Sequence, residues 1–257
     1  GGGALDGFSF RLSISASRGA KTPPPLSSAA MEGLTDHARD LLATKDTAAV
    51  VEYVVDNAEP VEALGLIRSL ANEAYWEVRN LNQAMALARA GMFAGIALSA
   101  HSDAPYELRS EAKSLAFNLA SYAWPGWDEA GIVIEHQHLV DALDAARTNV
   151  RLAVELEKGS VAIGRGHWMV GAVLLALGRY QEAIAEFLAA RLSADEGRSD
   201  VESALAEGYA ALVRVVERPG DVAIEAELTE TLDRLRGFED GETFARQIET
   251  ALRVFTA

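Results

Sequence analysis

Apolar side chains recur every three or four positions along most of the chain from Met31 to the C-terminus. This spacing forms one face of an α-helix, whereas a half-buried strand would alternate every second residue. Ala and Leu, which favour helices, dominate the composition, and the seven prolines lie outside the long periodic segments. The pattern predicts an all-α chain of consecutive helices joined by short links.

Interruptions of this periodicity predict where the helices begin and end. Two short helices come first, around 34–42 and 50–55, and Asp46 is a suitable N-cap for the second. Pro60 fits the first turn of the third helix. That helix and those after it are expected at 61–79, 80–100, 107–123, 137–158, 161–176, 180–194, 199–216, 221–236 and 240–255.

Residues 1–30 differ from the rest, because they are rich in Gly, Ser and Pro and hold one acid, Asp6. The three prolines at 23–25 predict a stiff linker, and residues 8–14 alternate apolar and polar as a strand does. This segment is expected to be either a mobile tail, with Met31 a possible natural start, or an extended segment that docks on a folded body. Residues 31–257 are expected to form one helical domain.

Charge and composition exclude several classes of function. The formal net charge is −15, without a cluster of Lys or Arg, which disfavours nucleic acid and anionic membranes as partners. No apolar run reaches the ~18–20 residues of a membrane helix, so a soluble, cytoplasmic protein is expected. There is no cysteine, which excludes disulfides and thiol catalysis. Residues 195–257 hold fifteen acids against seven arginines, which predicts either a solvated face or a docking surface for a basic partner.

The stretch GHWMVGAVLLALGRYQEAIAEFLAARL, residues 166–192, predicts two helices that approach closely. Gly171 and Ala183 are small enough for close contact, and Gly178 has the backbone freedom to end the first helix. Tyr180 and Phe187 would fill the wedge beside the pair. These residues resemble the joint of the tetratricopeptide repeat, a 34-residue helix pair. The chain departs from that pattern in having His at 167 and Asp at 195, where the family often has Trp and Pro.

Two further stretches carry similar residues at the spacing of that family. Gly91 and Phe93 are each followed 34 residues later by a residue suited to the same joint, which for Phe93 is Trp127. The run from Trp127 to Ala130 also matches the run that begins at Tyr180, 53 residues further on. The resemblance therefore implies an all-α, tetratricopeptide-like helix-pair solenoid, an α-α superhelix. The alternative is an irregular helical bundle with one chance match.

A solenoid of this kind has a concave face made by the first helix of each pair. The residues that the resemblance places there are mostly apolar or aromatic: Leu81, Asn82, Met85, Arg89, Leu115, Leu119, Tyr122, Trp168, Met169 and Leu175. None of the four lysines falls there, which argues against a site for an acidic peptide terminus. The predicted function is a scaffold that binds an apolar or amphipathic protein or peptide in this groove. Alternatively, these residues are core, covered by the terminal helices, by the 137–158 helix or by the tail.

Two functions of other kinds remain open from the sequence. Glu135, His136 and His138 lie together, so a helical enzyme or a ligand- or metal-binding domain with a pocket near the two histidines is the first alternative. Their two-residue gap does not suit ligands on one helix face, and no third ligand is evident. We therefore predict no catalytic residue, no metal and no cofactor. The second alternative is a structural subunit of a larger assembly, in which the tail and the acidic C-terminal third are buried.

Overall fold

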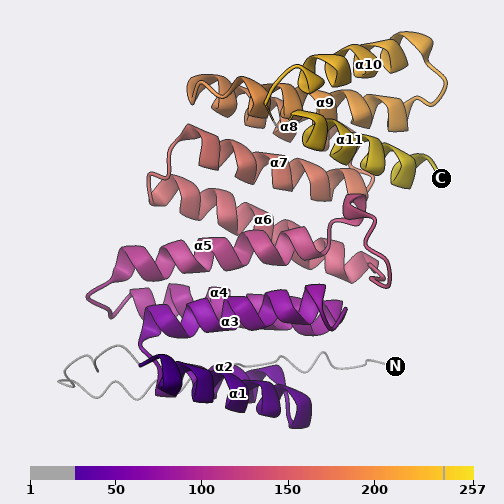
Figure 1. The fold of residues 1–257 in the computed structure, drawn as a ribbon. Helices are drawn as coiled ribbons and strands as arrows, with labels where there is room; N and C mark the ends of the chain where they lie inside the picture. The colour runs from indigo at the N-terminus through magenta and orange to yellow at the C-terminus, as the bar shows by residue number, and fades with distance from the viewer. Residues whose placement is uncertain (1–26, 240) are drawn as a thin grey trace, which may run out of the picture.

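A computed structural model of the chain describes residues 27–239 and 241–257 (Figure 1). The described residues form eleven α-helices and one short 3-10 helix, and they include no strand. The helices are α1 (Ser28–Thr44), α2 (Thr47–Asn57), α3 (Pro60–Trp76), α4 (Leu81–Ser99), α5 (Pro105–Tyr122), η1 (Pro125–Trp127), α6 (His136–Glu155), α7 (Ser160–Ala176), α8 (Tyr180–Glu196), α9 (Asp200–Glu217), α10 (Val222–Arg236) and α11 (Gly241–Thr256).

The prediction of an all-helical chain is confirmed for the described residues, and from α3 onward the expected bounds lie within three residues of those found. Helix α1 begins inside the segment expected to be a tail, because the Ser27 hydroxyl caps it by accepting a hydrogen bond from the Ala30 N–H at 3.3 Å. Asp46 caps α2 in the same way, as expected. The predicted linker at 23–25 and the alternating segment at 8–14 lie outside the described residues.

Each helix packs against the next one along the chain. Helices α3, α5, α7 and α9 also contact one another in that order, and they run in the same direction across the front of Figure 1. We call these four helices the odd row. Helices α4, α6 and α8 return behind them, and a continuous hydrophobic core extends from Leu34 to Ala251. The face of the odd row is therefore the broadest surface assembled from helices distant in sequence.

Similar turns end three successive helices. Glu157, Gly178 and Arg198 each have a positive φ, between 52° and 71°. In each turn the next residue donates its N–H to the carbonyl five residues earlier, as in a Schellman motif, at 2.9 to 3.0 Å. The expected role of Gly178 at the end of α7 matches this geometry. Repetition of one turn directs successive helices back and forth through the stack.

The joint between α7 and α8 has the close approach that its small residues suggest. A Cβ on Gly171 would lie 3.0 to 3.1 Å from three ring carbons of Phe187. Ala183 and Phe187 are fully buried, while Tyr180 begins α8 and is half-buried. The missing Cβ therefore lets the Phe187 ring lie flat against α7.

The other two stretches at the repeat spacing do not form such joints, which corrects that expectation. Helix α4 continues without a break through Gly91 and Phe93, because Gly91 packs against Leu115 and no proline interrupts the segment. Trp127 ends η1, and Ala130 is an exposed loop residue. Consecutive helices of the odd row begin 45, 55 and 40 residues apart, so none of these intervals is 34.

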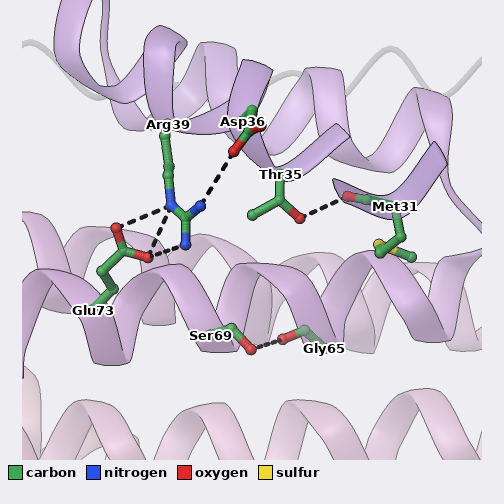
Figure 2. Close-up of polar contacts among 7 residues, drawn as sticks. All are labelled: Met31, Thr35, Asp36, Arg39, Gly65, Ser69 and Glu73. Atoms are coloured by element: carbon green, nitrogen blue, oxygen red, sulfur yellow. Dashed lines mark hydrogen bonds and ion pairs between the residues drawn. The ribbon is translucent and has the colours of Figure 1, made fainter. Parts of the chain in front are cut away.

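A polar contact joins the N-terminal helix to α3 (Figure 2). Arg39 on α1 donates three hydrogen bonds of 2.9 to 3.1 Å to the Glu73 carboxylate on α3, and a fourth of 3.3 Å to Asp36. Two of these bonds use the guanidinium as a fork, which fixes the relative orientation of the two side chains. The pair is substantially exposed, so it orients α1 more than it stabilises it.

The C-terminal helix α11 folds back over the end of the odd row, where it contacts α9, α10 and η1 (Figure 1). Ala245, Ile248 and Ala251 lie on one stripe of α11 and are fully buried. Gly208 on α9 leaves space for the Ile248 side chain. The chain thus closes part of this face with its own last helix.

We expect the substitution Gly171→Ala to destabilise the protein by about 1–3 kcal/mol, because the new methyl group meets a rigid ring in a packed joint. Gly33→Ala is the matched control: a Cβ on Gly33 meets nothing within 4 Å in α1, so higher helix propensity should stabilise by about 0.5–1 kcal/mol. Urea unfolding of the two variants measures both changes. Equal effects of the two substitutions would contradict the packing described for Gly171.

Candidate functional site

The apolar groove expected from the sequence is not an open surface. Eight of its ten residues are buried, namely Leu81, Met85, Leu115, Leu119, Tyr122, Trp168, Met169 and Leu175. Their side chains pack between helices, as the alternative interpretation of these residues proposed. A partner cannot contact them without local unfolding, so the expectation of an open groove at these positions is corrected.

The other two groove residues interact within the chain. The Asn82 Oδ1 lies 2.8 Å from His138 Nε2, and Arg89 pairs with Asp141. His138 also accepts the Glu135 N–H at its Nδ1, at 3.0 Å, in a capping box at the start of α6. His138 thus acts as a helix cap, and within the described ranges no three His, Asp or Glu side chains are grouped as metal ligands.

An aromatic cluster explains why the C-terminal half of the face is closed. We define it as Trp124, Trp127, Trp168, Tyr209 and Phe255. The Trp124 ring is fully buried and lies 5.3 Å from that of Phe255 on α11 and 6.3 Å from that of Tyr209 on α9. Trp168 packs edge-on against Tyr209 at 5.2 Å and lies 6.1 Å from Trp127. Rings from the loop after α5 and from α11 thus cover α7.

The segment 123–135, between α5 and α6, is the longest connection in the described chain, since each of the other connections has at most five residues. It holds η1 and then Asp128, a non-glycine residue with φ +55°. Such a conformation costs about 1–2 kcal/mol and is tolerated by Asp better than by most residues. Long, locally strained loops on a rigid scaffold often carry function, so this segment is the first candidate.

This segment forms a recess with the end of α3. The recess has a volume of about 210 Å³ and is lined by Tyr75, Trp124, Pro125, Asp128, Glu129, Ile132 and Ile134. Sites for small-molecule ligands usually have about 300–1,000 Å³, so this recess is the size of a single side chain. A second cavity, between α7, α8 and α9, has a volume of about 10 Å³ and holds no more than a water molecule.

The recess combines aromatic walls with carboxylates at its rim. Asp128 pairs with Arg253 of α11 at 3.0 Å, and Glu129 pairs with Arg79 at 2.7 Å. Burial, and secondarily the negative charge of Glu129, raise the pKa of Tyr75 to about 12. Tyr75 therefore keeps its phenol proton at neutral pH and presents a neutral wall beside two anions.

Exposed apolar side chains adjoin the residues that line the recess. Trp76 is 51% exposed and packs edge-on against Tyr75, with ring centroids 4.8 Å apart. Val78 is 60% exposed and lies two residues later, and Val133 is 75% exposed between the lining residues Ile132 and Ile134. Apolar groups beside a recess are a usual feature of protein-binding surfaces.

None of the residues lining the recess was among the binding residues predicted from the sequence. Their signal was the irregular stretch WPGWDEAGIVIEH, residues 124–136, which is too long for a tight turn. The match of Trp127 to the repeat pattern assigned this stretch to a helix joint instead. Length and the mixture of aromatic and acidic residues would have indicated a functional loop.

No protein-family model, curated protein or solved structure matches this chain. Among the described helices, none combines the length and the apolar character required to cross a membrane. The geometry of the recess therefore carries the functional argument.

Alkaline pH tests the burial of Tyr75. Its folded pKa is about 12 against about 10 when unfolded, so its contribution to stability is complete below pH 10 and is lost as pH rises toward 12. Between roughly pH 9 and 11, unfolding of the native chain should lose about 1.4 kcal/mol more than that of Tyr75→Phe. Urea unfolding at both pH values measures this, and equal losses would contradict the buried position of the hydroxyl.

Proposed function

We propose that the chain is a scaffold of stacked helix pairs, related in packing to tetratricopeptide repeats but built of longer units. Contacts between helices two apart along the chain and the similar turns at three joints support this architecture. In such a scaffold each pair contacts only its neighbours. A face made by several helices is then available for a partner.

The scaffold binds a segment of a partner protein at the recess beside α3, rather than in an apolar groove along the odd row. The observation that carries this proposal is the recess itself, with the exposed side chains of Trp76 and Val133 beside it. Apolar contacts with these side chains would supply affinity, and the recess would select the side chain that enters it. Its volume suits a peptide side chain and is small for a metabolite.

Selection of peptides from a random library displayed on phage tests this function. We expect the native chain to enrich peptides whose affinity falls at least about tenfold in Trp76→Ala, because a half-exposed aromatic residue beside a pocket is a typical binding hot spot. Fluorescence anisotropy measures the dissociation constants, and circular dichroism confirms that the variant is folded.

Phe93→Ala is the matched control, since Phe93 is 57% exposed on α4 and adjoins no residue of the recess. It should leave the affinity unchanged. Failure to enrich any peptide, or equal affinity for the native chain and both variants, would contradict binding at the recess.

A further inference from the structure

We infer that the recess accepts the guanidinium group of an arginine presented by a partner protein. This inference rests on the proposed binding function and identifies the side chain that anchors it. Three features lead to it: the unused oxygens of two adjacent carboxylates, the aromatic and apolar walls, and an arginine of the chain itself that is bound in a similar way at the rim.

The two carboxylates keep capacity for a further cation. Asp128 uses Oδ2 to accept from Arg253, and Glu129 uses Oε2 to accept from Arg79. The second oxygen of each carboxylate has no hydrogen-bond partner within the described ranges. A carboxylate has about four acceptor positions on its two oxygens, and the planar fork of a guanidinium matches them closely.

The walls suit the rest of an arginine side chain. The rings of Tyr75 and Trp124, with Pro125, Ile132 and Ile134, present carbon surfaces to the recess. An arginine buries its methylene stem against such surfaces while its head stays with the carboxylates. The flat guanidinium also stacks favourably on an aromatic ring. A lysine would gain the charge but not the forked or stacked geometry.

Arg79 already displays this mode of recognition at the rim. Its Cζ lies 5.9 Å from the centroid of the Trp76 ring, and its Nη1 donates to Glu129. The side chains of Arg79 and Arg253 are 41% and 65% exposed, so their ion pairs are screened and weak. An incoming arginine can share or exchange these partners at little cost. The chain's charge of −15 adds a long-range attraction for a basic segment.

Titration of the full chain with N-acetyl-arginine methylamide tests the inference. The probe is compared with the matched lysine derivative and with the citrulline derivative, which keeps the shape of arginine but lacks its charge. The readout is the indole N–H signal of Trp124 in nitrogen–proton NMR spectra, assigned by Trp124→Phe. The signal of Trp168, which does not line the recess, is the internal reference. We expect arginine to shift the Trp124 signal at concentrations at least about tenfold lower than citrulline does.

Three variants separate recognition from a structural role. Glu129→Gln should weaken arginine binding about tenfold, because it removes a charge-assisted hydrogen bond. Arg79→Ala should strengthen binding about threefold, because it removes a weak internal competitor for the same carboxylate. A purely structural ion pair would instead make both substitutions act in the same direction. Arg39→Ala, which removes an exposed arginine paired with Glu73 on α3, should have no effect.

Equal shifts by arginine and citrulline, no shift with any probe, or no loss of affinity in Glu129→Gln would overturn the arginine anchor. Those results leave the proposed function standing if selected peptides still lose affinity in Trp76→Ala. Loss of the peptide result alone would instead reject the proposed function. A stronger response to lysine than to arginine would also overturn the inference, because the forked geometry would then have no role.

Discussion

The burial of Trp124 is the contact on which the rest of this face depends. Its ring lies at the end of α5, touches the rings of Tyr209 and Phe255, and is fully buried. A buried aromatic residue of this size contributes several kcal/mol, and its removal from a core typically costs about 3–5 kcal/mol. Through this ring, three elements separated by more than a hundred residues are held together: the loop after α5, helix α9 and helix α11.

This single contact has two opposite consequences for binding. On one side it lets η1 and α11 cover the apolar residues of α7, so the C-terminal half of the face is closed core. On the other side the same ring forms a wall of the recess beside Tyr75. The loop can hold Asp128 in a strained conformation because Arg253 of α11 is placed next to it. The same packing that closes the apolar groove thus builds a smaller, charged site at its edge.

Most of the helices could be predicted because the information for them is local. Periodic apolar residues, N-caps such as Asp46 and a turn glycine such as Gly178 act within a few positions of the chain. The repeat spacing misled for the same reason. Gly91 and Trp127 have the right residue types at the right interval, but a glycine in a well-packed helix does not end it, and an aromatic residue before a loop does not begin one.

The recess could not be predicted in this way, because its shape depends on contacts between distant positions. Arg253 lies 125 residues from Asp128, and Arg79 lies 50 residues from Glu129. Nothing in the local sequence indicates that these charges meet. The exposure of Trp76, against the burial of the neighbouring Tyr75, is likewise set by packing across helices. Sequence analysis therefore identified the apolar residues correctly as a group but could not determine whether they were covered.

Site-specific photocrosslinking tests the central claim, that a partner docks at the recess, most directly. A benzophenone side chain is placed at Val133, beside the recess, and separately at Leu192 on α8; both positions are exposed. Each labelled chain is irradiated with a bound, arginine-containing peptide. Binding at the recess predicts an efficient crosslink from position 133 and none from position 192. A crosslink from 192 with none from 133 would contradict it and place the partner on another face of the molecule.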